Sequence, residues 1–387
     1  MLFKKFICFI ISCGIMLSCI LPCFAEEENT PVILSSKSAI VMECSTGQVL
    51  YEHNGREKLP MASVTKLMCM LIWAEEISAG RLSFDDTIRC SAYASSRDGS
   101  VIWLMPNEEM SAKDIIKSVV IASANDATTA LCEHIAGSER DFVRLMNEKA
   151  KELGMNDTCY KNCVGYDEDG HYTTAYDIAL LCGEVSKYDY YNEFFNTRLD
   201  YVREGEKAAQ LLNTNKLMRY YNGIIGGKTG TTDNAGCCLA VWAKRGNMTI
   251  CAVSLGCKED NERFDACESL LDYGFNGFEL YKAVADSSKL IPVEVDGGLR
   301  KETDIRVKRL VTMVIPKGSS TDVKYSYEIA EKLTAPVNCG QRVGKVTATL
   351  YDDVIFESDI IAVYNVEEMS FWSAALWIVW QRPFRTS

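Results

Sequence analysis

The fold and the chemistry are predicted first from residues 63–66, Ser63-Val64-Thr65-Lys66. An apolar run at helical spacing follows it, through residues 67–74. Residues three apart on a helix share a face, so the Lys66 amine is placed within reach of the Ser63 hydroxyl. A serine is a poor nucleophile until a base takes its proton, and a desolvated lysine can be that base. The spacing therefore predicts a nucleophile and its base, although a serine at a helix start is more often only a cap.

Two later stretches fit the same chemistry. Residues 123–125 (Ser-Ala-Asn) stand at an expected break between two helices, where their side chains would face a cleft or simply cap the second helix. Residues 226–231 (Gly-Gly-Lys-Thr-Gly-Thr) predict a strand whose edge a substrate backbone can approach. Residues 226–231 are not a phosphate-binding loop, because the first glycine of that motif is missing at the required spacing.

Together, and in this order, the three motifs match the signature of class A β-lactamases and penicillin-binding proteins. The chain resembles that superfamily over nearly its whole length, most closely the low-molecular-mass D-alanyl-D-alanine carboxypeptidases, which are serine peptidases. Residues 123–127, 171–175 and 270–275 belong to the resemblance. It implies an α+β fold: a β-lactamase/transpeptidase-like catalytic domain, with an antiparallel sheet flanked by helices, followed by a small all-β domain.

The resemblance also implies roles in catalysis. Ser63 would attack the carbonyl of the terminal D-Ala-D-Ala bond while Lys66 takes its proton. Ser123, bonded to Lys66, would pass a proton to the leaving amine, and Asn125 would orient the substrate amide and hold Lys66. The backbone N–H groups of Ser63 and Thr231 would form an oxyanion hole. The ester would then be hydrolysed by water.

Recognition of the substrate's free carboxylate is assigned by the same resemblance. The side chains expected near it are Lys228, Thr229, Thr231 and Arg263, and an arginine can bind a carboxylate through two hydrogen bonds. For Arg263, a solvated helix arginine is the competing interpretation. The sequence departs from the family pattern at Ala124, where relatives can carry Asp, and at Thr231, where some carry His. Peptidoglycan stem peptides are the expected substrates, and β-lactam antibiotics the expected covalent inhibitors.

Three alternatives remain open. A β-lactamase would share the motifs, but the loop that contains Glu168 lacks the Glu-x-x-x-Asn pattern that such an enzyme needs. A Ser-His-Asp hydrolase is disfavoured because no Gly-x-Ser-x-Gly elbow occurs. A non-catalytic wall-binding relative would have no need to keep all four polar side chains: Ser63, Lys66, Ser123 and Lys228.

The ends of the chain predict export and membrane attachment. Residues 1–25 have a basic start at Lys4 and Lys5, an apolar run and a small-x-small site at Ala25, so they resemble a signal peptide. A lipoprotein signal ending at Cys19 is the competitor. Residues 369–387 hold three tryptophans and two arginines, which suits an amphipathic anchor at the outer face of the cytoplasmic membrane, beside the cell wall. A tail helix packed on the protein is the alternative.

Composition excludes other functions. Without residues 1–25 the formal charge of −12 becomes −14, because two lysines and no acids are lost, and such a surface repels nucleic acid. Thirteen cysteines remain, scattered among apolar neighbours, and buried free thiols are favoured over disulfides; Cys159 and Cys163 are the pair to check for a bridge. With three histidines and no Cys-x-x-Cys, neither a metal nor another cofactor is expected.

The order of elements completes the prediction. The domains are expected to be a catalytic domain over residues 30–285, a β-rich domain over 290–366 and the anchor over 369–387. In the first, we expect a hairpin (38–43 and 48–52), weak strands (87–90 and 101–104), a helix capped by Ser111, three strands (223–228, 239–244 and 248–255) and a closing helix (261–275). In the second, we expect strands at 291–295, 305–314, 348–350 and 360–366, with a helix at 325–333.

Overall fold

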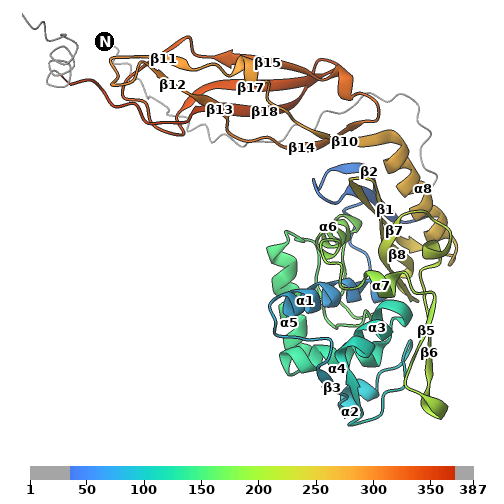
Figure 1. Ribbon diagram of the computed structural model, residues 1–387. Helices are drawn as coiled ribbons and strands as arrows, with labels where there is room; N and C mark the ends of the chain where they lie inside the picture. Colours follow the sequence, from blue (N-terminus) through green and yellow to red (C-terminus); the bar gives the residue numbers. More distant parts are fainter. Residues whose placement is uncertain (1–34, 371–387) are drawn as a thin grey trace, which may run out of the picture. The chain divides into compact units, whose positions relative to one another are not determined.

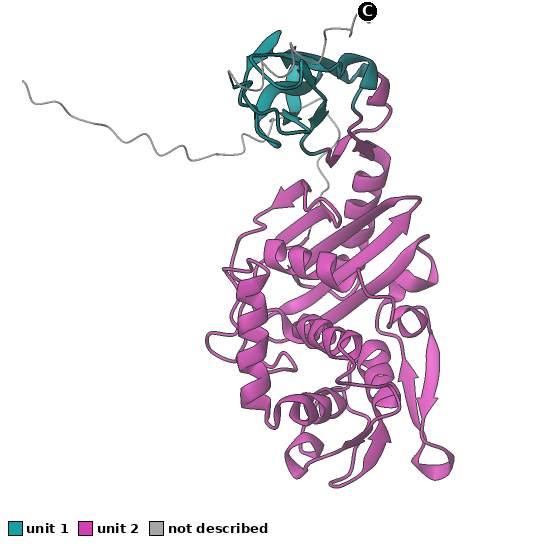
Figure 2. Ribbon diagram, turned by 60° about the vertical axis from the view of Figure 1, so that its left-hand side comes forward, with its two compact units in different colours: residues 1–29, 285–309, 322–387 teal, residues 30–284, 310–321 magenta. Residues whose placement is uncertain are grey.

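The computed structural model describes residues 35–370 of the chain, and these form two compact units (Figures 1 and 2). The described part of the larger unit comprises residues 35–284 and 310–321, and that of the smaller unit residues 285–309 and 322–370. The predicted signal peptide, 1–25, and all but the first two residues of the predicted anchor, 369–387, lie outside the described residues. Within residues 35–370, no helix has the length and apolar character needed to cross a bilayer.

A five-stranded antiparallel sheet forms the centre of the larger unit, with strand order β2-β1-β9-β8-β7. The predicted hairpin and the three predicted later strands are confirmed, with slightly different ends. The strands are β1 (Ser38–Glu43), β2 (Val49–His53), β7 (Ile224–Thr232), β8 (Gly236–Arg245) and β9 (Met248–Cys257). β7 therefore lies at an edge of the sheet.

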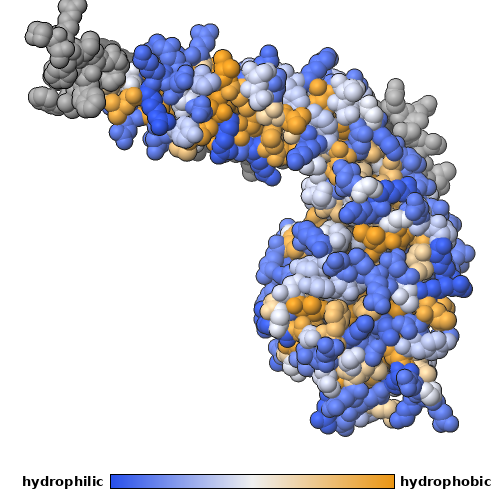
Figure 3. Space-filling model, viewed as in Figure 1, coloured by the Kyte–Doolittle hydropathy of each residue, from blue (hydrophilic) through white to orange (hydrophobic). Residues whose placement is uncertain are grey.

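Both faces of this sheet are covered, because alternate side chains of a strand point to opposite faces. In β1, Ile40 and Met42 pack into one core, whereas Ala39 and Val41 pack into the other. The first core contains the helices between β2 and β7, and the second contains helix α8 (Glu262–Gly277). On the outer surface visible in Figure 3, hydrophobic residues lie in patches interrupted by hydrophilic ones. The α+β fold is confirmed.

Several helices on the first face begin at side-chain caps that their sequences offer. Ser111, Ser138 and Thr174 each accept a hydrogen bond from the backbone three residues later, which stabilises a helix start. The helices are α1 (Lys66–Ser78), α2 (Ala92–Ser95), α3 (Ala112–Ala122), α4 (Asn125–Ala136), α5 (Glu139–Glu152), α6 (Ala175–Val185) and α7 (Asn192–Phe195). Residues 66–74 of α1 are all buried, so α1 is a core helix, as its apolar run predicts.

Three two-stranded sheets complete the larger unit. They pair β3 (Thr87–Arg89) with β4 (Glu109–Ser111), β5 (Leu199–Val202) with β6 (Ala209–Leu212), and β10 (Phe278–Lys282) with β14 (Thr312–Pro316). The expected strand at 101–104 is wrong. The backbone N–H groups of Ile102 and Leu104 instead donate to the buried Asp126 carboxylate, which replaces the hydrogen bonds of a strand partner.

The smaller unit is built from strands. They are β11 (Val293–Asp296), β12 (Glu302–Thr303), β13 (Ile305–Val307), β15 (Lys324–Ile329), β16 (Lys332–Thr334), β17 (Arg342–Leu350) and β18 (Asp353–Ala362). The expected helix at 325–333 is wrong, because β15 and β16 occupy it and burial along β15 alternates with the period of two of a strand. The single run expected at 305–314 is two strands, β13 in this unit and β14 in the larger one.

Candidate active site

Ser63 lies in a short 3₁₀ turn (Ala62–Thr65) that leads directly into α1. The Lys66 Nζ donates to the Ser63 Oγ at 2.7 Å and to the Val164 carbonyl oxygen at 2.7 Å. The Ser63 hydroxyl also lies 3.3 Å from this carbonyl oxygen. The three-residue spacing therefore brings hydroxyl and amine into direct contact, and a carbonyl from a distant loop fixes both.

Lys66 has no exposed surface, and its burial lowers the pKa of its amine to about 8. Burial has this effect because it removes the water that stabilises the charged ammonium, whereas the neutral amine loses much less stabilisation. The amine is thus neutral in a substantial fraction of molecules near pH 8. A neutral amine beside a hydroxyl can accept the hydroxyl proton, which is the requirement for a general base.

Three buried thiols, Cys69, Cys132 and Cys163, lie in the surroundings of Lys66. The Cys69 Sγ lies 3.2 Å from the Cys163 carbonyl oxygen, and burial raises the pKa of the Cys132 and Cys163 thiols. Cys132 and Cys163 are therefore neutral thiols beside the lysine. The thirteen cysteines of the described residues are free, so Cys159 and Cys163 are not bridged.

The second motif lies where α3 ends and α4 begins. Ser123 has a left-handed backbone (φ 63°), which turns the chain sharply between the helices. The expected hydrogen bond from Ser123 to Lys66 is absent: the buried Ser123 Oγ has no partner among the described residues. The Lys66 amine instead uses the Val164 carbonyl, because the loop before Gly165 packs directly over it.

Asn125 also differs from expectation. It does not hold Lys66; its Nδ2 donates to the Asp98 carbonyl oxygen at 2.7 Å and lies 3.5 Å from the Tyr166 hydroxyl. Its Oδ1 is buried and has no partner among the described residues, so this oxygen is free to accept from an incoming amide. The side chain therefore ties together two loops beside Ser63 while keeping one acceptor unused.

The third motif is the middle of β7, and it lies against Ser63. A Cβ atom at Gly230 would be 2.8 Å from the Ser63 backbone nitrogen and 2.9 Å from the Met61 carbonyl oxygen. A glycine is thus required for this close approach of two backbones. Because β7 is an edge strand, no further strand of this sheet covers its outer row of backbone groups.

Lys228 and Thr229 are buried next to this contact. The Lys228 Nζ donates to the Thr229 carbonyl oxygen at 2.7 Å, and the Thr229 hydroxyl donates to the Thr214 hydroxyl at 2.7 Å. Burial, followed by the positive charges of Lys66 and Arg263, holds the pKa of Lys228 well below its usual range. An anionic group brought close would favour the charged form of Lys228.

Arg263 on α8 is buried and lies under the same strand. Its Nη1 donates to the Gly230 carbonyl oxygen at 2.8 Å, the Thr231 hydroxyl at 2.9 Å and the Cys238 carbonyl oxygen at 3.2 Å, and Asp260 pairs with its Nη2. The guanidinium therefore supports the backbone of β7. Binding a carboxylate directly would require it to exchange some of these bonds.

The sequence does not predict that the loop before His171 joins these parts. The Val164 carbonyl, which accepts from Lys66, belongs to it, and a backbone oxygen leaves no signal in a sequence. Buried His171 also holds this loop: its Nδ1 accepts from the Lys161 backbone N–H at 3.0 Å, and its Nε2 lies 2.8 Å from the Thr65 hydroxyl. Burial lowers the pKa of His171 to about 4, so the ring is neutral at physiological pH. Residues 35–370 contain no cluster of side chains suited to a metal ion.

Comparisons with known proteins identify the family of the chain. The sequence profile of D-alanyl-D-alanine carboxypeptidases matches residues 25–259, and that of the penicillin-binding protein 5 C-terminal domain matches residues 278–368. D-alanyl-D-alanine carboxypeptidase DacF of Bacillus subtilis is 37% identical over 364 residues, covering 92% of this chain and 94% of its own. DacC of Escherichia coli is 33% identical over 358 residues, covering 90% and 88%. The structure of penicillin binding protein 5 from Haemophilus influenzae superposes with a TM-score of 0.77 at 26% identity, covering 88% of this chain and 99% of that one.

Proposed function

The chain belongs to the D-alanyl-D-alanine carboxypeptidase family, and we propose that Ser63 is the nucleophile through which it acts. It is a serine-type D-Ala-D-Ala carboxypeptidase, a peptidase of the low-molecular-mass penicillin-binding type. Its expected substrates are the peptidoglycan stem peptides that end in D-Ala-D-Ala. The activity follows from the family, whereas the assignment of individual residues rests on the site.

The observation that carries the residue assignment is the 2.7 Å contact between the Lys66 Nζ and the Ser63 Oγ, made by an amine whose pKa is lowered to about 8. Lys66 takes the hydroxyl proton as the Ser63 oxygen attacks the penultimate D-alanine carbonyl. The backbone N–H groups of Ser63 and Thr231 stabilise the oxyanion. The peptide bond then breaks, its nitrogen gains the proton that Ser63 lost, the terminal D-alanine leaves with a neutral amine, and an ester remains on Ser63.

Ser123 delivers the proton to the leaving amine. Its unpartnered, buried hydroxyl supports this role, because such a group is available to bond to a substrate atom. The Asn125 Oδ1 accepts from the substrate amide. Lys228, Thr229 and Thr231 surround the terminal carboxylate, with Arg263 fixing the strand behind them. Water finally hydrolyses the ester and releases the shortened peptide.

Covalent capture by penicillin tests the nucleophile. Intact protein should gain the mass of one penicillin that persists for minutes, because the amine released when the β-lactam ring opens stays attached to the acyl group and hinders the approach of water to the ester. Peptide mapping should place the added mass on Ser63, and Ser63→Ala should gain none. An adduct on Ser123, or no adduct, would overturn the assignment. Rapid turnover of nitrocefin would instead identify a β-lactamase.

We also propose that the protein is exported and held at the outer face of the cytoplasmic membrane by residues 369–387. A basic and apolar stretch at residues 1–25 supports export. The residues that support attachment are Trp372, Trp377, Trp380, Arg382 and Arg385, which suit the interface of an anionic membrane. Full-length protein should float with anionic liposomes, and protein truncated before Met369 should not. Equal behaviour of the two would exclude an anchor.

A further inference from the structure

Trp103 is the most exposed large hydrophobic side chain among the described residues, with 73% of its surface exposed. It lies in the loop of residues 96–108, which joins α2 to β4 (Figure 1). The residues on either side of it, Ile102 and Leu104, are buried in the core. A single exposed hydrophobic side chain needs no explanation by itself. The backbone that carries this one does need an explanation.

Trp103 has a left-handed backbone, with φ 56°. This conformation is strained for a bulky residue, because its Cβ atom comes close to the following carbonyl oxygen. Tyr351 is also an exposed aromatic residue with a positive φ, 50°, but it stands in the two-residue turn between β17 and β18, where a hairpin requires such a φ. Residues 101–105 belong to no helix or strand, so a hairpin does not account for Trp103.

The strained backbone is held from both sides. The N–H groups of Ile102 and Leu104 donate to the buried Asp126 carboxylate, at 3.2 and 2.9 Å. The Arg203 Nη1 donates to the Ile102 carbonyl oxygen at 2.9 Å. Strain of this kind persists only where the surroundings impose it, and it gathers at functional sites. Here its effect is to leave the Trp103 ring in solvent, between two neighbours that are buried.

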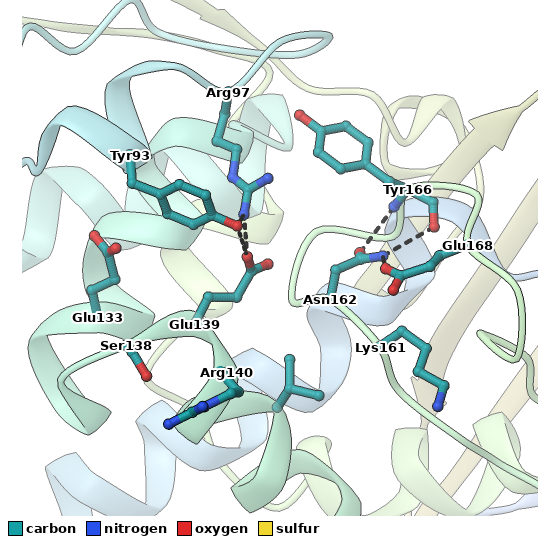
Figure 4. Close-up of a pocket in the computed structure, with 11 residues that line it drawn as sticks. Tyr93, Arg97, Glu133, Ser138, Glu139, Arg140, Lys161, Asn162, Tyr166 and Glu168 are labelled. Atoms are coloured by element: carbon teal, nitrogen blue, oxygen red, sulfur yellow. Dashed lines mark hydrogen bonds and ion pairs between the residues drawn. The ribbon is translucent and has the colours of Figure 1, made fainter.

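The same loop begins at the active site. Arg97 forms an ion pair with Glu139 of α5, and Figure 4 shows the two side chains pointing toward each other. The next residue, Asp98, accepts from the Asn125 Nδ2 at 2.7 Å through its carbonyl oxygen, and the Ser100 carbonyl oxygen accepts from the Asn125 backbone N–H at 2.6 Å. The first part of the loop therefore packs on the residue expected to hold the substrate amide.

The distance from this contact to the Trp103 ring matches the length of a stem peptide. Three residues lead from Ser100 to Trp103, which span at most about 10 Å. In the proposed function, Asn125 binds the amide that precedes the D-Ala-D-Ala end. The other three residues of a stem pentapeptide lead back to the glycan strand and also span at most about 10 Å. The glycan is therefore the part of the substrate that lies as far from Asn125 as Trp103 does.

The chemistry of the loop suits a sugar better than a membrane or a protein. A sugar ring has C–H groups on its face and polar groups at its edge, so a flat aromatic ring in polar surroundings fits it. The only basic residue of the loop, Arg97, is already paired, and Asp98 is an exposed acid, so an anionic membrane would be repelled. Besides Trp103, the loop exposes only Met105 as a large hydrophobic residue, which is little for a protein interface.

We propose that the Trp103 ring stacks on a sugar of the glycan strand that carries the stem peptide. The ring covers the C–H face of one N-acetylated amino sugar, and Met105 extends the apolar contact. The enzyme then acts preferentially on peptides that are still attached to glycan. This inference rests on the proposed function, because it takes the bound peptide to lie beside Ser63 and Asn125. It assigns a binding role to a loop outside the three motifs.

Two substrates that differ only in the glycan test the proposal. One is a pentapeptide ending in D-Ala-D-Ala with a lactyl group on its N-terminus, and the other is the same lactyl peptide attached to a peptidoglycan tetrasaccharide. For wild-type protein, kcat/KM for D-alanine release should be about tenfold higher with the tetrasaccharide, as one stacking contact on an aromatic ring allows. The difference should appear in KM, because the contact is the same before and during the reaction.

Variants then locate the effect at the ring. Trp103→Asn should abolish the advantage of the tetrasaccharide, whereas Trp103→Phe should keep most of it. Asparagine tolerates a left-handed backbone, so Trp103→Asn should leave the melting temperature unchanged or raise it. A ring kept only for folding would give the opposite result, a lower melting temperature with an unchanged ratio of kcat/KM. Tyr351→Asn is the matched control, because it makes the same change at an exposed aromatic residue with a positive φ in the smaller unit.

Three results would overturn the glycan assignment. They are equal kcat/KM for the two substrates in wild-type protein, an equal loss for both substrates in Trp103→Asn, and an unchanged ratio in a Trp103→Asn protein that has lost self-association or flotation with anionic liposomes. The last result would assign the ring to a second copy or to a membrane. Penicillin capture separates these failures from a failure of the proposed function. If the adduct forms on Ser63 but the substrates are equal, only the glycan assignment is wrong. If wild-type protein forms no adduct, the catalytic assignment is wrong first.

Discussion

The active site has two sides, and each holds one buried lysine. On the α1 side, the Lys66 amine touches the oxygen of Ser63, 2.7 Å away. On the β7 side, the only hydrogen bond of the Lys228 amine within residues 35–370 is to a backbone carbonyl, also 2.7 Å away. Burial lowers the pKa of both amines, so burial alone does not distinguish a base from a binding residue. The neighbouring atom distinguishes them: Lys66 contacts the hydroxyl of the proposed nucleophile and can take its proton, whereas Lys228 contacts a carbonyl oxygen that has no proton to give.

The largest effect on the acylation rate should appear when Lys66 is removed. Lys66→Ala should slow acylation by penicillin by about 10²–10⁴-fold, the usual contribution of a positioned general base. Rapid-quench mass measurement of the adduct gives this rate. The melting temperature of the variant controls for folding. If Lys66→Ala were acylated at the wild-type rate, the distinction between the two lysines would be lost.

The second prediction concerns the contact that holds the two sides together. In Gly230→Ala, the added methyl group would meet the Ser63 backbone nitrogen at 2.8 Å, so β7 must move away from Ser63. A displacement of this kind should lower the acylation rate by about 10²-fold. Gly277→Ala is the matched control, since a Cβ atom there would have no neighbour within 4 Å. Equal rates for the two variants would show that the contact is not needed.

A smaller effect is expected from the β7 side. Lys228→Ala should lower kcat/KM by about 10–100-fold for peptides with a free terminal carboxylate, which corresponds to roughly 1.5–3 kcal/mol for a contact with a charged group. For the same peptides with an amidated terminus, wild type and variant should be alike. Steady-state release of the terminal residue measures both. An equal loss with the amidated peptides would assign Lys228 a purely structural role.

The smallest expected effect is on pH dependence. Lys66 must be neutral to act as base, and its pKa is lowered to about 8, so it is mainly protonated below this pH and mainly neutral above it. The acylation rate should therefore rise about tenfold from pH 7 to pH 9 and then level off. Lys228→Ala should keep a rise of this shape. A rate independent of pH in wild-type protein would contradict the role of Lys66 as the group that titrates.

Much of the larger unit could be predicted from local patterns. The spacing of Ser63 and Lys66, the cap at Ser111 and the hairpin of β1 and β2 each depend on residues close in sequence. What could not be predicted depends on distant partners. The Val164 carbonyl replaces Ser123 as a partner of Lys66, and it does so only because Gly165 packs on the backbone of residues 62–63.

The errors in the fold have a similar origin. Residues 324–329 contain charged and aromatic side chains that suit either a helix or an exposed strand. They form a strand because they pair with β17, a long-range interaction that local patterns do not reveal. Residues 101–104 look like a strand because they are apolar. Their backbone N–H groups are satisfied by the carboxylate of Asp126, which belongs to a helix that begins more than twenty residues later.

The free thiols have a consequence for the unfolded chain. In the folded protein, Cys69, Cys132 and Cys163 are fully buried, so oxidants in solution cannot reach them. Unfolding exposes these thiols together with the other free cysteines, and thiols held near one another in a flexible chain cross-link readily in air. A molecule that has formed a non-native disulfide cannot refold. Heat denaturation in air should therefore be irreversible, and the lifetime of the protein in an oxidising compartment is set by its unfolding rate rather than by its equilibrium stability.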